Sequence, residues 1–316
     1  RYLIRELLGV GGMGRVYRAV QLDLERPVAL KLLDHDLGLN SREVERFHQE
    51  ALAASRIDHP GVAMIHDHGQ WDDRHYLVME LLRGQNLFQL TRQEGPLTHG
   101  RVVAILAQVC DVLEEAHEAG LVHRDLKPEN IMVAKGSRGT ERVKVVDFGL
   151  ASIMWQYTRD REGGPVTLSG TPFYMSPEQC RCGVVDHRSD IYSLGVILYE
   201  LIAGQPPFYD QQPARVLLGH LYAEPPPISA AQAHPASAAL EALCRDALSK
   251  VPNQRPQSAA NFRDRMLAAL GISTERADDP VMGSSWREAE LPTLNTDMPA
   301  VQGVNGPGRV LIFALD

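Results

Sequence analysis

The sequence predicts an α+β protein of two lobes, with a small β-rich lobe that contains one helix and a larger helical lobe. Short β-forming runs separated by turns extend to about residue 82, and helical patterns begin at Leu87. The segment 189–204 is apolar nearly all round, which is typical of a helix buried inside a lobe. We therefore divide the chain into 1–82, 83–270 and a linker or loosely ordered tail over 271–316, where Gly and Pro replace any periodicity.

The small lobe is predicted from three β-forming runs and one amphipathic helix. The clearest strand is "PVALKLL" (27–33), and two more are expected near 62–66 and at "HYLVMEL" (75–81). Between them, Asn40 and Glu43 form a plausible capping box for a helix that extends to Ala54. Glu50 falls within the apolar stripe of this helix. A carboxylate there needs a cationic partner, or it lies at the edge of the stripe and reaches solvent.

The larger lobe is predicted from a series of helices. The segment 102–120 is strongly amphipathic and ends at Gly120. After the buried helix over 189–204, further helices are expected at about 213–222, 236–249 and 258–270.

Composition and charge exclude several classes of protein. A formal net charge of -8 argues against sequence-independent binding of nucleic acid. No apolar stretch approaches the roughly 18 residues that a membrane span needs, so no membrane contact is expected within this chain. The 4 cysteines are irregularly spaced, which favours a reducing, cytoplasmic compartment. Membrane anchoring of a longer protein would lie outside these residues.

The glycines of "GVGGMGRVY" (9–17) fit two kinds of phosphate-binding loop. Gly9, Gly11 and Gly14 have the spacing G-x-G-x-x-G. In a dinucleotide-binding turn this loop leads into a helix, and Asp34 or Asp36 lies near the position of a ribose-binding acid. In a flap over ATP, a strand stands on each side of the loop. The local pattern leaves both open.

Two later stretches carry the decisive chemistry. "LVHRDLKPENIMV" (121–133) supplies Asp125, Lys127 and Asn130, and "VKVVDFGLA" (143–151) places Asp147 at the end of an apolar strand. Phosphoryl transfer needs such a set, because its transition state spreads negative charge that the protein must neutralise and position. An Asp can accept the proton of an attacking hydroxyl, a Lys can bind the γ-phosphate, and the oxygens of Asn and Asp suit Mg²⁺.

With these stretches the chain resembles a serine/threonine protein kinase of the eukaryotic-like, or Hanks, type. The motif sequences "GGMGRVYRA" (11–19) and "SPEQ" (176–179) are most similar to those of bacterial members. The resemblance covers roughly residues 1–270 and rests on several separated motifs in the right order. It implies the two-lobe kinase fold, ATP as a substrate, Mg²⁺ or alternatively Mn²⁺ as the cofactor, and proteins as phosphate acceptors.

The resemblance also implies roles for individual residues. Asp125 would be the catalytic base and Lys127 the cation at the γ-phosphate, while Lys31 would hold the α- and β-phosphates and pair with Glu50. Asn130 and Asp147 would bind the metal. The residues expected around the nucleotide are Leu8, Gly9, Val10, Gly11, Gly12, Met13, Gly14, Val16, Ala29, Lys31, Met79, Glu80, Leu82 and Met132. For Val16, Ala29 and Met132, a place in the plain core fits the sequence equally well.

Substrate and regulation are implied by further positions. Lys127 and Gly170-Thr171 resemble the pattern directed at Ser and Thr hydroxyls. Arg124 would gather a phosphorylated activation loop, for which Thr167 and Ser169 are the candidate phosphosites. Thr171 is better explained as a structural or substrate-contacting hydroxyl of the same segment. A dimer would allow one copy to phosphorylate the other.

Other resemblances are structural. Glu178 and Arg255 resemble an ion pair that ties the end of the activation segment to the large lobe, and Asp190 resembles an acid that braces the catalytic loop. Val251 replaces the Asp usual in the family, which puts a local turn contact in doubt. Two other functions compete with an active protein kinase, namely a pseudokinase or scaffold, and a small-molecule kinase.

Overall fold

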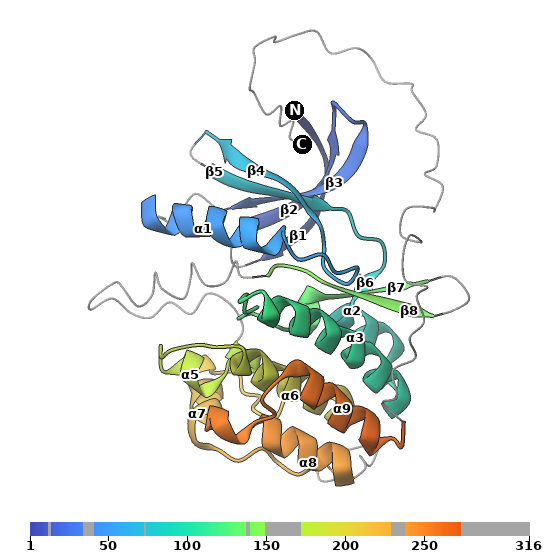
Figure 1. Ribbon diagram of the computed structural model, residues 1–316, viewed down its shortest axis with the longest axis vertical. Coiled ribbons are helices and arrows are strands. Elements are labelled where there is room, and N and C mark those ends of the chain that lie inside the picture. Colours follow the sequence, from blue (N-terminus) through green and yellow to red (C-terminus); the bar gives the residue numbers. More distant parts are fainter. Residues whose placement is uncertain are drawn as a thin grey trace.

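Two lobes with a small sheet between them form the molecule, as the computed structural model shows (Figure 1). The structure describes residues 1–11, 14–33, 41–72, 74–136, 140–148, 172–228 and 238–272, with mainly the backbone over 41–48. Strands β1–β5 and helix α1 form the small lobe, and most of the helices form the other lobe. The α+β, two-lobe prediction is confirmed.

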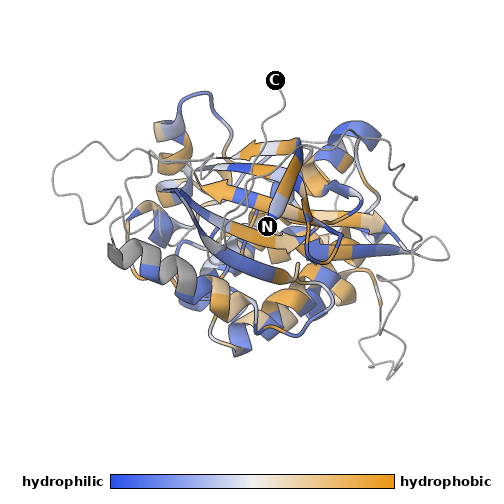
Figure 2. Cartoon of the chain, turned by 90° about the horizontal axis from the view of Figure 1, so that it is seen from above, coloured by the Kyte–Doolittle hydropathy of each residue, from blue (hydrophilic) through white to orange (hydrophobic). Residues whose placement is uncertain are grey.

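The small lobe is a five-stranded antiparallel sheet with one helix. Its strand order is β1-β2-β3-β5-β4. The elements are β1 (Tyr2–Gly11), β2 (Gly14–Gln21), β3 (Arg26–Leu33), α1 (Ser41–Ala54), β4 (Ile65–Trp71) and β5 (Arg74–Glu80). Seen from above, hydrophobic residues follow the strands of this sheet (Figure 2), and Ala19, Val28, Leu30 and Val78 are buried in its core.

The glycine-rich loop joins two paired strands. β1 pairs with β2 in antiparallel register, Gly11 lies opposite Gly14, and β2 begins at Gly14. Gly14 has a φ of 146°, and a Cβ there would lie 2.1 Å from the carbonyl oxygen of Leu32, so only glycine fits. A strand, and not a helix, therefore follows the loop, which is the arrangement expected of a flap over ATP.

The large lobe is mainly helical. Its short sheet consists of β6 (Gln85–Asn86), β7 (Ile131–Lys135) and β8 (Glu141–Val145). Its α-helices are α2 (Leu87–Glu94), α3 (His99–Glu118), α5 (Pro177–Cys180), α6 (Arg188–Ala203), α7 (Pro213–Tyr222), α8 (Ala238–Ala247) and α9 (Ala259–Ala269). Three 3₁₀ turns are η2 (Pro128–Asn130), η4 (Pro172–Tyr174) and η6 (Pro252–Gln254). Among the described helices, none is both long and apolar enough to cross a membrane.

Helix α6 is the centre of the large lobe. Fourteen residues of this helix, from Ser189 to Ala203 with Glu200 excepted, are buried, as its all-round apolar sequence predicts. It packs closely on α8, because a Cβ on Gly195 would lie 2.7 Å from the Cβ of Ala247. The first turn of α6 carries Asp190, a buried acid that is only 1 % exposed.

Two predicted boundaries differ from the structure. The strand expected near 62–66 begins only at Ile65, because Val62 forms an isolated parallel bridge with Val145 of β8. The helix expected at 102–120 begins at His99, where the side chain of Thr98 accepts a hydrogen bond from the N–H of Arg101 at 3.4 Å. Most of the predicted tail, from residue 273 onward, lies outside the described residues.

Hydrogen bonds and an ion pair connect the two lobes at strand β8. The N–H of Val145 donates to Gly61 O at 2.7 Å, and Val145 O accepts from the N–H of Ala63 at 3.2 Å. Beside them, Lys144 Nζ donates to Glu80 Oε2 at 2.7 Å. Since Asp147 follows two residues after β8 ends at Val145, these contacts fix its strand against the small lobe.

Candidate active site

A cavity of about 1100 Å³ lies between the two lobes. Both lobes contribute to its walls, and many of the residues that the sequence singles out meet there. From the small lobe these are Val10, Gly11, Gly14, Val16 and Lys31, and from the large lobe Arg124, Asp125, Lys127, Asn130 and Asp147.

Asp125, Lys127 and Asn130 form one hydrogen-bonded group on the floor of the cavity. Lys127 Nζ donates to Asp125 Oδ2 at 2.6 Å. Asn130 Nδ2 donates to the backbone oxygen of Asp125 at 2.8 Å and to its Oδ2 at 3.3 Å. The carboxylate of Asp125 is therefore oriented from two sides, and it lies where a hydroxyl in the cavity could give up a proton to it.

His123 holds the backbone of this loop. Its Nδ1 accepts the N–H of Asp125 at 3.2 Å, so its Nε2 carries the proton and donates to Val146 O at 2.9 Å. The imidazole is fully buried and its ring lies 4.8 Å from the ring of Phe148. His123 thus ties the loop that carries Asp125 to the strand end that carries Asp147.

Asp147 occupies a strained and charged position. Its φ of 63° is in the left-handed region, which a residue other than glycine rarely adopts. Burial would raise the pKa of its carboxyl group, but the ammonium of Lys31, 2.9 Å from Oδ2, outweighs burial and lowers that pKa. Asp147 is therefore charged at neutral pH and able to bind a cation.

The predicted ion pair between Lys31 and Glu50 is wrong for this structure. Lys31 Nζ lies 2.9 Å from Asp147 Oδ2, and Glu50 Oε1 accepts a hydrogen bond from Arg124 Nη1 at 3.2 Å. Lys31 is 6 % exposed, so its charge needs a nearby carboxylate, and Asp147 supplies it from the opposite wall. The expected need of Glu50 for a cation is correct, but the cation comes from the catalytic loop.

The oxygens of Asn130 and Asp147 fit the requirements of Mg²⁺. Both residues line the same cavity, and Asn130 uses its Nδ2 to bind Asp125, so Oδ1 is the atom that could bind a metal. A carboxylate and an amide oxygen are hard donors of the kind that Mg²⁺ prefers, with phosphate oxygens and water completing an octahedron.

The residues predicted around the nucleotide are only partly brought together. Ala29 and Met79 are buried in one apolar cluster, and Val16, which lines the cavity, packs against it. Leu8 and Gly9 lie in β1, Glu80 ends β5, and Met132 lies in β7. As far as the described residues define the cavity, these four and Leu82 lie outside its lining.

Five predicted site residues fall outside the described part of the chain. These are Gly12 and Met13 at the tip of the flap, and Thr167, Ser169 and Thr171 in the activation segment.

Glu200 is a residue of the cavity that the sequence reasoning missed. It lines the cavity together with Tyr174 and Glu129, and Tyr174 Oη donates to Glu200 Oε2 at 2.7 Å. Burial and the nearby charge of Glu129 raise the pKa of Glu200 to about 7, although the hydrogen bond from Tyr174 opposes this shift. The available signal was a single acid near the end of an otherwise apolar helical sequence.

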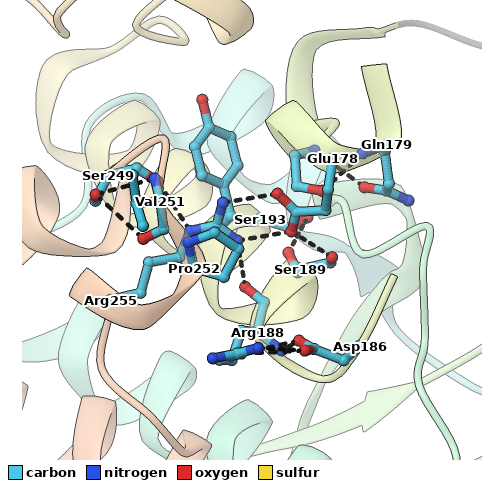
Figure 3. A network of polar contacts seen from close by, with 12 residues as sticks. Glu178, Gln179, Asp186, Arg188, Ser189, Ser193, Ser249, Val251, Pro252 and Arg255 are labelled. Atoms are coloured by element: carbon cyan, nitrogen blue, oxygen red, sulfur yellow. Dashed lines mark hydrogen bonds and ion pairs between the residues drawn. The ribbon is translucent and has the colours of Figure 1, made fainter. Parts of the chain in front are cut away.

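The predicted ion pair between Glu178 and Arg255 is confirmed (Figure 3). Arg255 Nη1 and Nη2 donate to the two carboxylate oxygens of Glu178, each at 2.7 Å, and its side chain is completely buried. Val251 supplies no side-chain cap to η6. Ser249 Oγ accepts the N–H of Val251 at 3.3 Å, so this turn is held by a neighbouring hydroxyl.

The chain is similar to proteins of one known family. The chain matches the protein kinase domain family over residues 2–266. It is 45% identical over 301 residues to serine/threonine-protein kinase pkn3 of Myxococcus xanthus, and 40% identical over 271 residues to serine/threonine-protein kinase PknB of Mycobacterium tuberculosis. A crystal structure of the Mycobacterium tuberculosis PknI kinase domain superposes with a TM-score of 0.70 at 30% identity, covering 86% of this chain and 96% of that one.

The matched regions differ in their share of each protein. The pkn3 match covers 93% of this chain and 54% of the relative, and the PknB match covers 83% and 42%. The chain therefore spans about half the length of these curated relatives.

The raised pKa of Glu200 predicts a pH-dependent effect on stability. Because Glu200 has a pKa of about 7 in the folded protein and an ordinary value near 4.5 when unfolded, the folded state binds more protons between these values. Stability from this group is therefore lost as pH rises through that window. Glu200→Gln keeps an acceptor for Tyr174 and removes the charge.

Urea unfolding at pH 4 and pH 8 measures this effect. We expect Glu200→Gln to match the original protein at pH 4 and to exceed its free energy of unfolding by about 3 kcal/mol at pH 8. Glu118→Gln, at an exposed acid ending α3, should change little at either pH. An equal difference at both pH values for Glu200→Gln would contradict the raised pKa.

Proposed function

Since the chain belongs to the protein kinase family, we propose that it transfers the γ-phosphoryl group of ATP to Ser and Thr hydroxyl groups of proteins. The observation that carries this proposal is the meeting of Asp125, Lys127, Asn130, Asp147 and Lys31 in one cavity between the lobes. The similarity to kinases named for serine and threonine supports the acceptor class.

Each residue has a task in this reaction. The acceptor oxygen attacks the γ-phosphorus, its proton passes to the carboxylate of Asp125, and the bond from phosphorus to the β-phosphate oxygen breaks. Lys127 lies 2.6 Å from Asp125 and can move to the γ-phosphate, while Lys31 offers its charge to the α- and β-phosphates. Asn130 and Asp147 would hold Mg²⁺, which neutralises charge on the phosphates.

The flap contributes through its backbone. Among the described residues, no atom lies within 4 Å of the place that a Cβ on Gly9 would take. A Cβ on Gly11 would meet only the backbone oxygen of Gly14, at 3.9 Å. Phosphate oxygens can therefore come close to the N–H groups of this hairpin.

Regulation by phosphorylation is part of the proposal. Arg124 lies in the wall of the cavity and binds Glu50 at 3.2 Å. A phosphate on Thr167 or Ser169 would compete for its guanidinium, because a phosphate accepts two parallel hydrogen bonds from Arg. Glu50 would then be released toward Lys31. We also propose a cytoplasmic location and a dimer in which one copy phosphorylates the other.

Phosphoryl transfer to a generic basic protein tests the central proposal. Asp125→Asn should lower kcat by roughly 10²- to 10⁴-fold, since an amide cannot accept the proton. Asp72→Asn is a matched control, because Asp72 lies in the exposed turn between β4 and β5 with a φ of 45° that Asn tolerates. Equal activity of the original protein and Asp125→Asn would exclude the catalytic assignment and favour a pseudokinase or scaffold. Transfer only to small molecules would favour a small-molecule kinase.

Mass spectrometry of the protein after incubation with Mg²⁺ and ATP tests the regulatory sites. We expect phosphate on Thr167 or Ser169, and none on protein that carries Asp125→Asn. Active protein with phosphate only outside residues 150–175 would refute this assignment.

A further inference from the structure

The peptide that joins Arg124 to Asp125 is held in an uncommon conformation. Arg124 has a φ of 65°, in the left-handed region, where a residue other than glycine is strained. The direction of this peptide determines where the carboxylate of Asp125 points. Two N–H groups are fixed, since the N–H of Arg124 donates to Asp190 Oδ1 at 2.9 Å and that of Asp125 to His123 Nδ1 at 3.2 Å.

The carbonyl oxygen of the same peptide is bound by a residue outside the catalytic loop. Gln179 Nε2 donates to the oxygen of Arg124 at 2.7 Å. Gln179 belongs to α5, in the "SPEQ" sequence at the end of the activation segment, and it is 1 % exposed. The contact joins residues 55 positions apart in the sequence.

The other end of the Gln179 amide has a separate task. Its Oε1 accepts the N–H of Ser176 at 3.0 Å, while the N–H of Gln179 donates to Ser176 Oγ at 3.3 Å. These two bonds form the capping box of α5. Oε1 therefore serves the helix end, and Nε2 serves the catalytic loop.

The helix that carries Gln179 is itself firmly anchored. Figure 3 shows Gln179 next to Glu178, whose carboxylate holds the buried Arg255 through two bonds of 2.7 Å. Ser189 Oγ also donates to Glu178 Oε1, at 2.5 Å. Gln179 thus projects from a fixed support toward the peptide that precedes the catalytic base.

We propose that Gln179 is a positioning residue for Asp125, which it orients by binding the carbonyl oxygen of Arg124. This inference rests on the proposed kinase function. With Asp190 and His123 it completes three hydrogen bonds that hold a strained backbone in place, as a strained site requires.

At neutral pH the amide of Gln179 meets both demands, whereas a methionine or an ionised glutamate does not. A methionine has a similar length but no donor, so it leaves the buried oxygen of Arg124 without this partner. An ionised glutamate keeps the acceptor for Ser176 and brings a second acceptor toward Arg124. A protonated glutamate has one O–H donor and can restore the bond.

The test compares Gln179→Met, Gln179→Glu and Ser176→Ala by kcat, KM for ATP and thermal unfolding. We expect Gln179→Met to lower kcat about 10-fold with KM for ATP within twofold, which corresponds to one lost positioning bond. Ser176→Ala removes the hydroxyl of the capping box and should lower the melting temperature with kcat within twofold. Gln179→Glu should lose activity at pH 8 and regain part of it, relative to the original protein, at pH 6.

Several results would overturn the proposal. One is a kcat of Gln179→Met within twofold of the original, and another is an equal loss of kcat in Gln179→Met and Ser176→Ala, which would make Gln179 a capping residue only. If Gln179→Met does not fold, a ratio of Gln179→Glu to original activity that is constant between pH 6 and pH 8 has the same meaning. Failure of the proposed function is distinct, because the original protein would then be no more active than Asp125→Asn.

Discussion

The candidate active site depends on the hydrogen bonds that the buried carboxylate of Asp190 makes. This carboxylate accepts hydrogen bonds from the backbone N–H groups of His123 and Arg124, at 2.8 and 2.9 Å, and is bound by His117 Nε2 at 2.8 Å. Burial would raise the pKa of Asp190, but these donors lower it, so the group stays charged inside the lobe. Because α6 is buried along nearly its whole length, Asp190 gives the catalytic loop a rigid reference point.

Two residues of the candidate site have a strained backbone, and hydrogen bonds and an ion pair hold them in place. Arg124 and Asp147 both have positive φ values, of 65° and 63°. Arg124 precedes the proposed base Asp125, and Asp147 is a proposed metal ligand. Strained residues persist where their surroundings over-determine them. Here the backbone at Arg124 is held by Asp190, His123 and Gln179. Asp147 is held across the lobe boundary by its ion pair with Lys31.

The sequence predicted what depends on local pattern and motif order. The two lobes, the strand after Gly14, the brace by Asp190 and the pair of Glu178 with Arg255 follow from periodicity or from the family resemblance. The ion-pair partner of Lys31 could not be predicted, because its long side chain can reach more than one carboxylate. Which carboxylate lies nearest depends on the folded structure. Glu200 and the second bond of Gln179 depend on contacts between distant segments, which no local pattern encodes.

The most direct test of this account is single-turnover phosphoryl transfer by Asp190→Asn, measured together with ATP binding and thermal unfolding. The amide keeps the shape of the side chain but places a donor against donors, so the loop that carries Asp125 loses its reference point. We expect folded protein with ATP affinity within a few-fold of the original and a transfer rate lower by roughly 100-fold. Folded Asp190→Asn protein that transfers phosphate at the original rate would contradict the account.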